Sequence, residues 1–262
     1  MKMKLIAVLM AAAVLTGAFA QAPYTIEVGG STSVTPLMEM FAAEYANTRP
    51  NVRVNINGTG SGDGITNAGS VYQIGMSSRE LTPAEQGRGL RVEIVAIDGI
   101  AVIVNRQNSV SNLTVEQIRG IYTGEITNWN RVGGRNARIA VVSREEGSGT
   151  RGAFEEIAGF QGRLVANSNQ LTSTGAILAN IAQNRDAIGY ISLGSINDTI
   201  KAVSVGGVAP TAENVVNGTY RIARPFIVLT GNNIHAETRS FVQWMLSAAG
   251  QAVVRRSWIP VR

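Results

Sequence analysis

Two short loops rich in glycine and hydroxyl residues carry the side chains of this sequence that are best suited to hold an anion. They are Gly30-Ser31-Thr32-Ser33 and Gly147-Ser148-Gly149-Thr150-Arg151. Each loop follows a run that alternates like a strand and precedes a run with helical spacing. Backbone N–H groups at a helix N-terminus are unpaired and partly positive, and serine and threonine hydroxyls add neutral donors. The two loops therefore predict one anion held from two sides.

The elements that must position these loops alternate between strands and helices. Strands are expected over 24–28, 52–56, 73–76, 92–97, 100–104, 138–143, 187–191 and 224–230, and helices over 36–45, 114–122, 150–158 and 238–254. A glycine-rich turn over 58–64 and a third hydroxyl-rich loop over 77–80 also follow strands. This rhythm is typical of an α/β fold with parallel strands, whose ligands bind beyond the carboxyl ends of the strands.

The first twenty residues have the pattern of a signal peptide. Lys2 and Lys4 precede an apolar stretch over 5–15, and Ala18-Phe19-Ala20 is a small-x-small cleavage site. We expect residues 1–20 to be removed and the mature protein to be periplasmic. The sequence has no cysteine, so neither a lipid-anchored cysteine nor a disulfide is expected.

Composition argues against several other classes of protein. His235 is the only histidine and lies in a polar stretch, so no nucleophile–base pair is expected, and the sequence lacks the common nucleophile and phosphate-loop motifs. With no cysteine and one histidine, the chain cannot form a metal site from these residues. A metal site made only of carboxylates is not ruled out by the sequence. The formal net charge of +5 is spread along the chain, unlike the basic patch of a nucleic-acid-binding protein. We expect no enzyme activity, cofactor, metal or nucleic acid.

Several motifs carry a resemblance to a known family, and they run through nearly the whole mature chain in one order. They are Gly30–Leu37, Gly60–Gly64, Ile74–Leu81, Ile121–Asn130, Arg144–Arg151 and Ala187–Tyr190. The chain resembles the phosphate-binding protein of bacterial phosphate ABC transporters. The resemblance implies a two-lobed type II periplasmic-binding-protein fold, each lobe a mixed, mostly parallel sheet flanked by helices. It places lobe one at 21–98 and 226–262 and lobe two at 99–225, with crossings near 98–100 and 224–226.

The resemblance also implies the residues that bind phosphate. Arg144 is the arginine that pairs with the anion, and the hydroxyl and backbone groups come from Ser31, Thr32, Ser33, Ser61, Ser78, Ser148, Gly149 and Thr150. Ser78 stands where many longer relatives have an aspartate. A carboxylate can accept a proton-bearing phosphate oxygen and repel sulfate, which carries no proton. Asp63 is therefore the candidate for selectivity, with Glu80 and Glu145 as weaker ones.

The expected function is capture of inorganic phosphate by a monomer and its delivery to an ABC permease in the membrane. Another tetrahedral oxyanion, such as sulfate, molybdate or tungstate, is the alternative within the same class. A secreted phosphate-ester hydrolase or an adhesion protein on this fold is the alternative from another class, because fold alone does not fix function. Each loop taken singly could also be an ordinary helix cap or turn.

Overall fold

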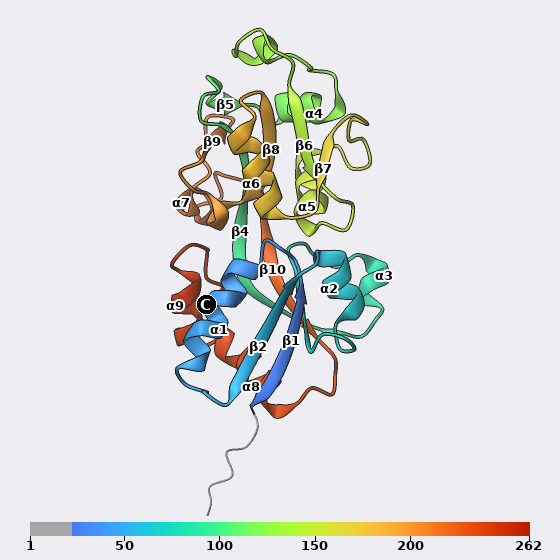
Figure 1. Cartoon of the computed structure of the whole chain (residues 1–262), viewed down its shortest axis with the longest axis vertical. Helices are drawn as coiled ribbons and strands as arrows, with labels where there is room; N and C mark the ends of the chain where they lie inside the picture. The colour runs from blue at the N-terminus through green and yellow to red at the C-terminus, as the bar shows by residue number, and fades with distance from the viewer. Residues whose placement is uncertain (1–22) are drawn as a thin grey trace, which may run out of the picture.

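The computed structural model describes residues 23–262 and shows an elongated molecule of two lobes stacked along its long axis (Figure 1). The predicted signal peptide lies outside the described residues. Two strands pass between the lobes, and every other helix or strand lies within a single lobe (Figure 1). The fold confirms the predicted α/β, two-lobed arrangement, and the sheet is mixed.

Lobe one is built around a sheet with the strand order β2-β1-β3-β10-β4. Its own elements are β1 (Tyr24–Gly30), α1 (Thr35–Ala46), β2 (Val52–Gly58), α2 (Ser61–Asn67), β3 (Ile74–Ser77), α3 (Pro83–Gln86), α8 (Ala236–Met245) and α9 (Ala248–Val254). Strand β1 is parallel to both β2 and β3, so their carboxyl ends meet at the edge of the sheet that faces lobe two (Figure 1). The loops that follow these strands are thereby gathered at that edge.

Lobe two continues the sheet in the order β4-β8-β6-β7, with β9 also paired to β4. Its own elements are β5 (Asn112–Leu113), α4 (Val115–Thr123), η1 (Trp129–Val132), β6 (Ala140–Arg144), α5 (Gly149–Ala158), β7 (Asn169–Leu171), α6 (Thr174–Gln183), β8 (Ala187–Ser192), η2 (Leu193–Ser195), β9 (Ile200–Val205) and α7 (Ala212–Val216). Strand β6 is parallel to β7 and β8, and the helices α5 and α6 begin where β6 and β7 end.

The two strands that join the lobes are β4 (Arg91–Asn105) and β10 (Ala223–Thr230), which pair antiparallel. The prediction of separate strands over 92–97 and 100–104 is wrong, because β4 is one continuous strand. Asp98 and Gly99 interrupt the apolar run in the sequence, but the ladder with β10 continues through both residues. The Asp98 side chain finds a partner on β10, so the chain does not need to turn there.

The long helix expected over 238–254 is two helices, α8 and α9, separated at Leu246 and Ser247. The Ser247 hydroxyl donates to the carbonyl of Trp244 at 2.6 Å and accepts from the N–H of Gly250 at 3.3 Å, which caps α9. A Cβ at Gly250 would lie 2.3 Å from the Trp244 carbonyl. The serine cap and this close approach of backbones account for the break, which the continuous apolar pattern concealed.

Each lobe has its own buried cores on the two faces of its part of the sheet. In lobe one the larger cluster joins the sheet to α1, α8 and α9, and a smaller cluster joins it to α2. In lobe two one cluster contains Tyr122, Phe154 and Tyr190, and the other packs α6 against β4 and β8. Trp129 is fully buried in lobe two, where it packs in the core. Within residues 23–262, no helix is long and apolar enough to cross a membrane.

Candidate functional site

The first predicted loop follows β1 and leads into α1. Gly30 has a φ of 135°, and a Cβ there would lie 2.3 Å from the Met76 carbonyl, so only glycine fits this position. The close approach lets the N–H of Ser31 donate to that carbonyl at 3.0 Å. The loop is thereby fixed to the neighbouring strand β3, and the hydroxyls of Thr32 and Ser33 lie close to Thr174 of lobe two.

Three serines of lobe one, from three different loops, form a buried cluster. The Ser31 hydroxyl donates to the oxygen of Ser78 at 2.9 Å, and the hydroxyls of Ser61 and Ser78 lie 3.3 Å apart. The N–H of Ser78 also donates to the Ser61 oxygen at 3.1 Å. All three side chains are at most 3% exposed. Parallel pairing of β1, β2 and β3 brings these residues together, as the carboxyl-end rule predicts.

The second predicted loop lies in lobe two and begins α5. The Ser148 hydroxyl accepts from the N–H of Arg151 at 3.3 Å and caps the helix. The loop therefore does have the capping role expected of serine before a helix. Ser148 and Thr150 are nevertheless buried, in a place where the end of the helix faces the other lobe. A cap that lies inside an interface between lobes can also bind a ligand there, so the two roles are compatible.

Direct contacts across the cleft bring the two loops together. The hydroxyl oxygens of Ser33 and Thr150 lie 2.8 Å apart, and the N–H of Gly62 donates to the carbonyl of Gly147 at 3.0 Å. A Cβ at Gly149 would lie 2.3 Å from the Ser61 hydroxyl and 2.8 Å from that of Ser78. The predicted residues Ser31, Ser33, Ser61 and Ser78 of lobe one thus meet Gly149 and Thr150 of lobe two, and the lobes are closed on each other.

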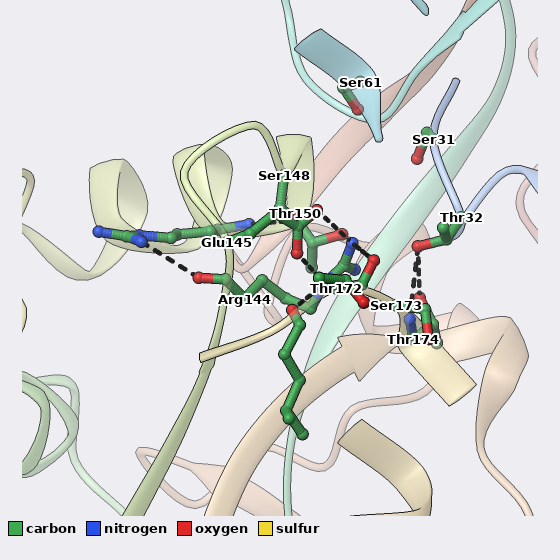
Figure 2. A network of polar contacts seen from close by, with 12 residues as sticks. Ser31, Thr32, Ser61, Arg144, Glu145, Ser148, Thr150, Thr172, Ser173 and Thr174 are labelled. Atoms are coloured by element: carbon green, nitrogen blue, oxygen red, sulfur yellow. Dashed lines mark hydrogen bonds and ion pairs between the residues drawn. The ribbon is translucent and has the colours of Figure 1, made fainter. Parts of the chain in front are cut away.

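Arg144 supplies the positive charge of the site from the end of β6 (Figure 2). Its guanidinium is almost fully buried, and Nε and Nη2 each donate to a carboxylate oxygen of Glu145 at 2.9 Å. The same two nitrogens also bond the carbonyls of Leu171 and Thr172 at 3.2 and 3.4 Å. These bonds fix the plane of the guanidinium without using Nη1. A planar guanidinium held in this way suits recognition of an oxyanion.

A further hydroxyl-rich loop, which was not predicted from the sequence, completes the cleft (Figure 2). It comprises Thr172, Ser173 and Thr174 at the start of α6. The Ser173 hydroxyl caps this helix, and the Thr174 hydroxyl lies 3.2 Å from that of Ser33 in lobe one. The N–H of Thr174 donates to the Thr32 hydroxyl at 3.4 Å. The sequence does contain a run of hydroxyl residues before Gly175. The preceding strand β7 has only three residues, which is too few to show the alternation of apolar and polar residues that identifies a strand.

Tyr190 is a second residue whose place in the site was not predicted. Its hydroxyl lies 2.7 Å from that of Ser143 and accepts from the backbone N–H of Arg144 at 3.2 Å. Burial raises the pKa of Tyr190 to about 12, so the phenol stays neutral at ordinary pH. A neutral phenol can hold the end of β6 without adding a negative charge close to the anion site.

The selectivity candidate Asp63 does not join the other predicted residues. Its carboxylate accepts from Asn67 Nδ2 at 2.7 Å, from the Tyr72 hydroxyl at 2.9 Å and from the Thr59 hydroxyl. Asp63 follows Ser61 by two residues on α2, and side chains two apart on a helix point in different directions. The structure therefore gives Asp63 a role in holding the glycine-rich turn, and its carboxylate is satisfied there.

Two other arginines from the motifs have structural partners. Arg79 makes a two-pronged ion pair with Glu85 at 2.7 and 2.8 Å, and a Cβ at Gly152 of α5 would lie 3.3 Å from Arg79 Cδ, so the pair lies beside lobe two. Arg151 donates to Glu155 at 2.6 Å and to the backbone carbonyl of Arg144 at 3.1 Å. Arg151 therefore supports the second loop from behind.

The site offers hydrogen-bond donors but no metal-binding arrangement. Among the residues that the structure describes, no three or more His, Cys, Asp or Glu side chains are grouped to hold a metal ion. His235, the only histidine, is exposed, and its Nδ1 accepts from the N–H of Glu237 at 3.2 Å at the start of α8. What the cleft provides is hydroxyls, the N-termini of α5 and α6, and the buried guanidinium of Arg144, a set suited to bind a small oxyanion.

Comparisons with known proteins agree with this chemistry. Residues 17–249 match the model of a PBP superfamily domain. The chain is 30% identical over 242 residues to the phosphate-binding protein PstS of Borreliella burgdorferi, with 87% of each chain covered.

Two solved structures are also similar. One is an ABC transporter substrate-binding protein of Clostridium perfringens with bound phosphate, which is 44% identical with a TM-score of 0.89 and covers 91% of this chain and all of its own. The other is an ABC-type phosphate transport receptor from Vibrio cholerae, which is 36% identical with a TM-score of 0.73. It covers 89% of this chain and 99% of its own.

Proposed function

The chain belongs to the PBP superfamily and, within it, to the PstS phosphate-binding proteins, and from this premise we propose that it captures inorganic phosphate between its lobes and delivers it to an ABC permease. The observation that carries the proposal is the meeting of Ser31, Ser61 and Ser78 from lobe one with Arg144 and the loop at positions 148–150 from lobe two. The similar proteins are named as binding and transport proteins, in agreement with the expectation that this chain is not an enzyme.

The proposed binding residues are those that the resemblance implied: Ser31, Thr32, Ser33, Ser61, Ser78, Arg144, Ser148, Gly149 and Thr150. Their hydroxyl and N–H groups neutralise the anion through dipoles, and Arg144 adds one full charge. We add the hydroxyl loop at positions 172–174 as a neighbour of the site on the lobe-two side. An anion that contacts both lobes shifts the equilibrium between open and closed forms towards closure, since it gains its full set of contacts only in the closed form.

We propose lobe boundaries of 21–98 with 226–262 for lobe one and 99–225 for lobe two. Separate cores in the two lobes support this division, and β4 and β10 are the segments that bend when the lobes open. The protein is proposed to act as a monomer in the periplasm after cleavage of residues 1–20. A membrane-bound permease then receives the phosphate when the lobes open.

Selectivity for phosphate over sulfate is proposed to depend on Glu145 rather than on Asp63. Glu145 is the carboxylate bonded to Arg144, whereas the partners of Asp63 are Thr59, Asn67 and Tyr72. A negative charge next to the guanidinium weakens binding of any dianion, and hydrogen phosphate can offset that penalty by donating its proton to an acceptor in the cleft.

Calorimetric titration of the mature protein with phosphate, sulfate and molybdate tests the proposed function. Phosphate is expected to bind much more tightly than the other two anions. Equal affinities for phosphate and sulfate would overturn the assignment. Tighter binding of molybdate would show instead that the protein is a receptor for another tetrahedral oxyanion.

A further inference from the structure

A buried ion pair lies where the two connecting strands cross between the lobes. Asp98 on β4 and Arg224 on β10 are register partners in the antiparallel ladder. Arg224 Nη2 lies 3.1 Å and Nε 3.3 Å from Oδ2 of Asp98, and neither side chain is more than 1% exposed. The crossings were predicted at these positions, but no role was predicted for either side chain.

The pair extends by hydrogen bonds into both lobes. On the side of lobe two, the Ser192 hydroxyl at the end of β8 donates to Oδ1 of Asp98 at 2.8 Å. On the side of lobe one, Nη1 of Arg224 donates to the backbone carbonyl of Ser78 at 3.2 Å. Ser78 is the centre of the serine cluster, since it bonds both Ser31 and Ser61. A continuous chain of polar contacts therefore runs from lobe two through the crossing strands to the proposed phosphate site.

Net stability is a weak explanation for this pair. Burial raises the pKa of the Asp98 carboxyl and lowers that of the Arg224 guanidinium, because both lose hydration, and their mutual attraction works against both shifts. A buried ion pair often adds little to stability compared with apolar residues of the same size, but it can enforce one particular arrangement. The geometry of Arg224 fits the second role, because its three nitrogens are divided between Asp98 and the Ser78 carbonyl.

We propose that Arg224 is a positioning residue of the phosphate site, which holds Ser78 in its binding position and ties that position to the crossing strands. The inference rests on the proposed function. Through Asp98, Arg224 is also connected to Ser192, so the closed arrangement of the lobes and the place of the Ser78 hydroxyl are set together. Loss of the Arg224 contacts is then expected to weaken phosphate binding although Arg224 itself does not touch the anion.

The test is a double-mutant cycle between Arg224 and Ser78, with the phosphate dissociation constant measured by titration calorimetry. Arg224→Lys keeps a charge for Asp98 but cannot reproduce the three-nitrogen pattern. It is expected to raise the dissociation constant about tenfold, the effect of one charge-assisted hydrogen bond. In a Ser78→Ala background the same change is expected to raise it less than about twofold, because the hydroxyl that Arg224 positions is already gone.

A purely structural role gives a different result, since it lowers the unfolding temperature without coupling to Ser78. Thr238→Val serves as a matched control: it deletes one buried hydroxyl, bonded to Tyr24 at 3.2 Å within lobe one, and is expected to leave phosphate affinity unchanged. If Arg224→Lys does not fold, Ser192→Ala provides the test, because it keeps the ion pair and removes the hydroxyl that orients Asp98, together with the 3.4 Å contact of that hydroxyl with Trp258 Nε1. For Ser192→Ala we expect about a threefold loss of affinity in wild type and none in the Ser78→Ala background.

Losses of equal size with and without the Ser78 hydroxyl, or unchanged affinity in the folded variants, would overturn the positioning role. Failure of wild-type protein to bind phosphate would instead overturn the proposed function. The two failures are therefore distinguishable within one set of titrations.

Discussion

Replacement of Arg144 by alanine is the most direct probe of the proposed site. The guanidinium is 2% exposed, and its Nε and Nη2 are fixed by Glu145 and by two backbone carbonyls. A hydrogen bond to a charged group contributes roughly 1.5–3 kcal/mol. Loss of Arg144 should therefore raise the phosphate dissociation constant about ten- to a hundredfold. Glu145 is 27% exposed, so water can hydrate its carboxylate in the variant and folding should be retained.

The assay is titration calorimetry with phosphate on three variants, accompanied by thermal unfolding. Arg144→Lys keeps the charge but loses the planar fork, so its affinity should lie between those of wild type and Arg144→Ala. Arg135→Ala is the control, because Arg135 is half exposed and pairs with Asp186 on the surface of lobe two. Surface pairs of this kind contribute about 0–1 kcal/mol to stability. Loss of this pair should therefore leave the phosphate affinity unchanged. Equal losses of affinity for Arg144→Ala and Arg135→Ala would refute the site.

Three further changes test separate parts of the structure. Gly149→Ala should abolish phosphate binding in titrations with little change in unfolding temperature, because its Cβ would lie 2.3 Å from a serine hydroxyl only when the lobes are closed; retained affinity would contradict the closed geometry. Asp63→Asn should leave the ratio of phosphate to sulfate affinity unchanged, whereas Glu145→Gln should lower it, and the opposite pattern in competition titrations would return selectivity to Asp63. Arg79 lowers the pKa of Glu85 from 4.5 to about 2, so this pair stabilises the fold above pH 4.5 and loses its effect as pH falls towards 2. Urea unfolding at about pH 6 and about pH 3 should show a smaller loss of stability in Glu85→Gln than in wild type, and an identical loss would argue against the pair.

The parts of the site that could be predicted from sequence are those with local patterns. A strand, a glycine, a run of hydroxyls and a helix occur in order around Ser31 and again around Ser148, and the structure brings both loops to one cleft. Parallel pairing explains why, because it places the ends of successive strands at one edge of the sheet. The order of the motifs was enough to indicate the fold, and the residues that bind phosphate stay a prediction for the titrations.

Asp63 shows where a motif stops being informative about the direction of a side chain. Both Ser61 and Asp63 belong to the same glycine-rich turn, and the sequence alone does not say which of them faces the cleft. Once the turn becomes the first part of α2, residues two apart diverge, and Asp63 pairs with Asn67, four residues later on the same side of the helix. The direction of a side chain therefore depended on whether the turn is helical, which the seven residues 58–64, four of them glycine, did not reveal.

The ion pair of Asp98 and Arg224 was beyond the reach of sequence patterns for a different reason. The two residues are 126 positions apart, and each stands alone among apolar neighbours without a motif. Only the register of β4 with β10 puts them opposite each other, and that register depends on the complete sheet. Burying an unpaired charge within a strand costs free energy unless an opposite charge or hydrogen-bond donors lie next to it. Asp98, which stands within an apolar run, therefore needs a partner in the folded protein. The structure supplies that partner, Arg224, at the crossing between the lobes, where its Nη1 lies 3.2 Å from the carbonyl of Ser78 in the proposed phosphate site. The proposed positioning role follows from this contact, because a movement of the crossing strands would also move Ser78.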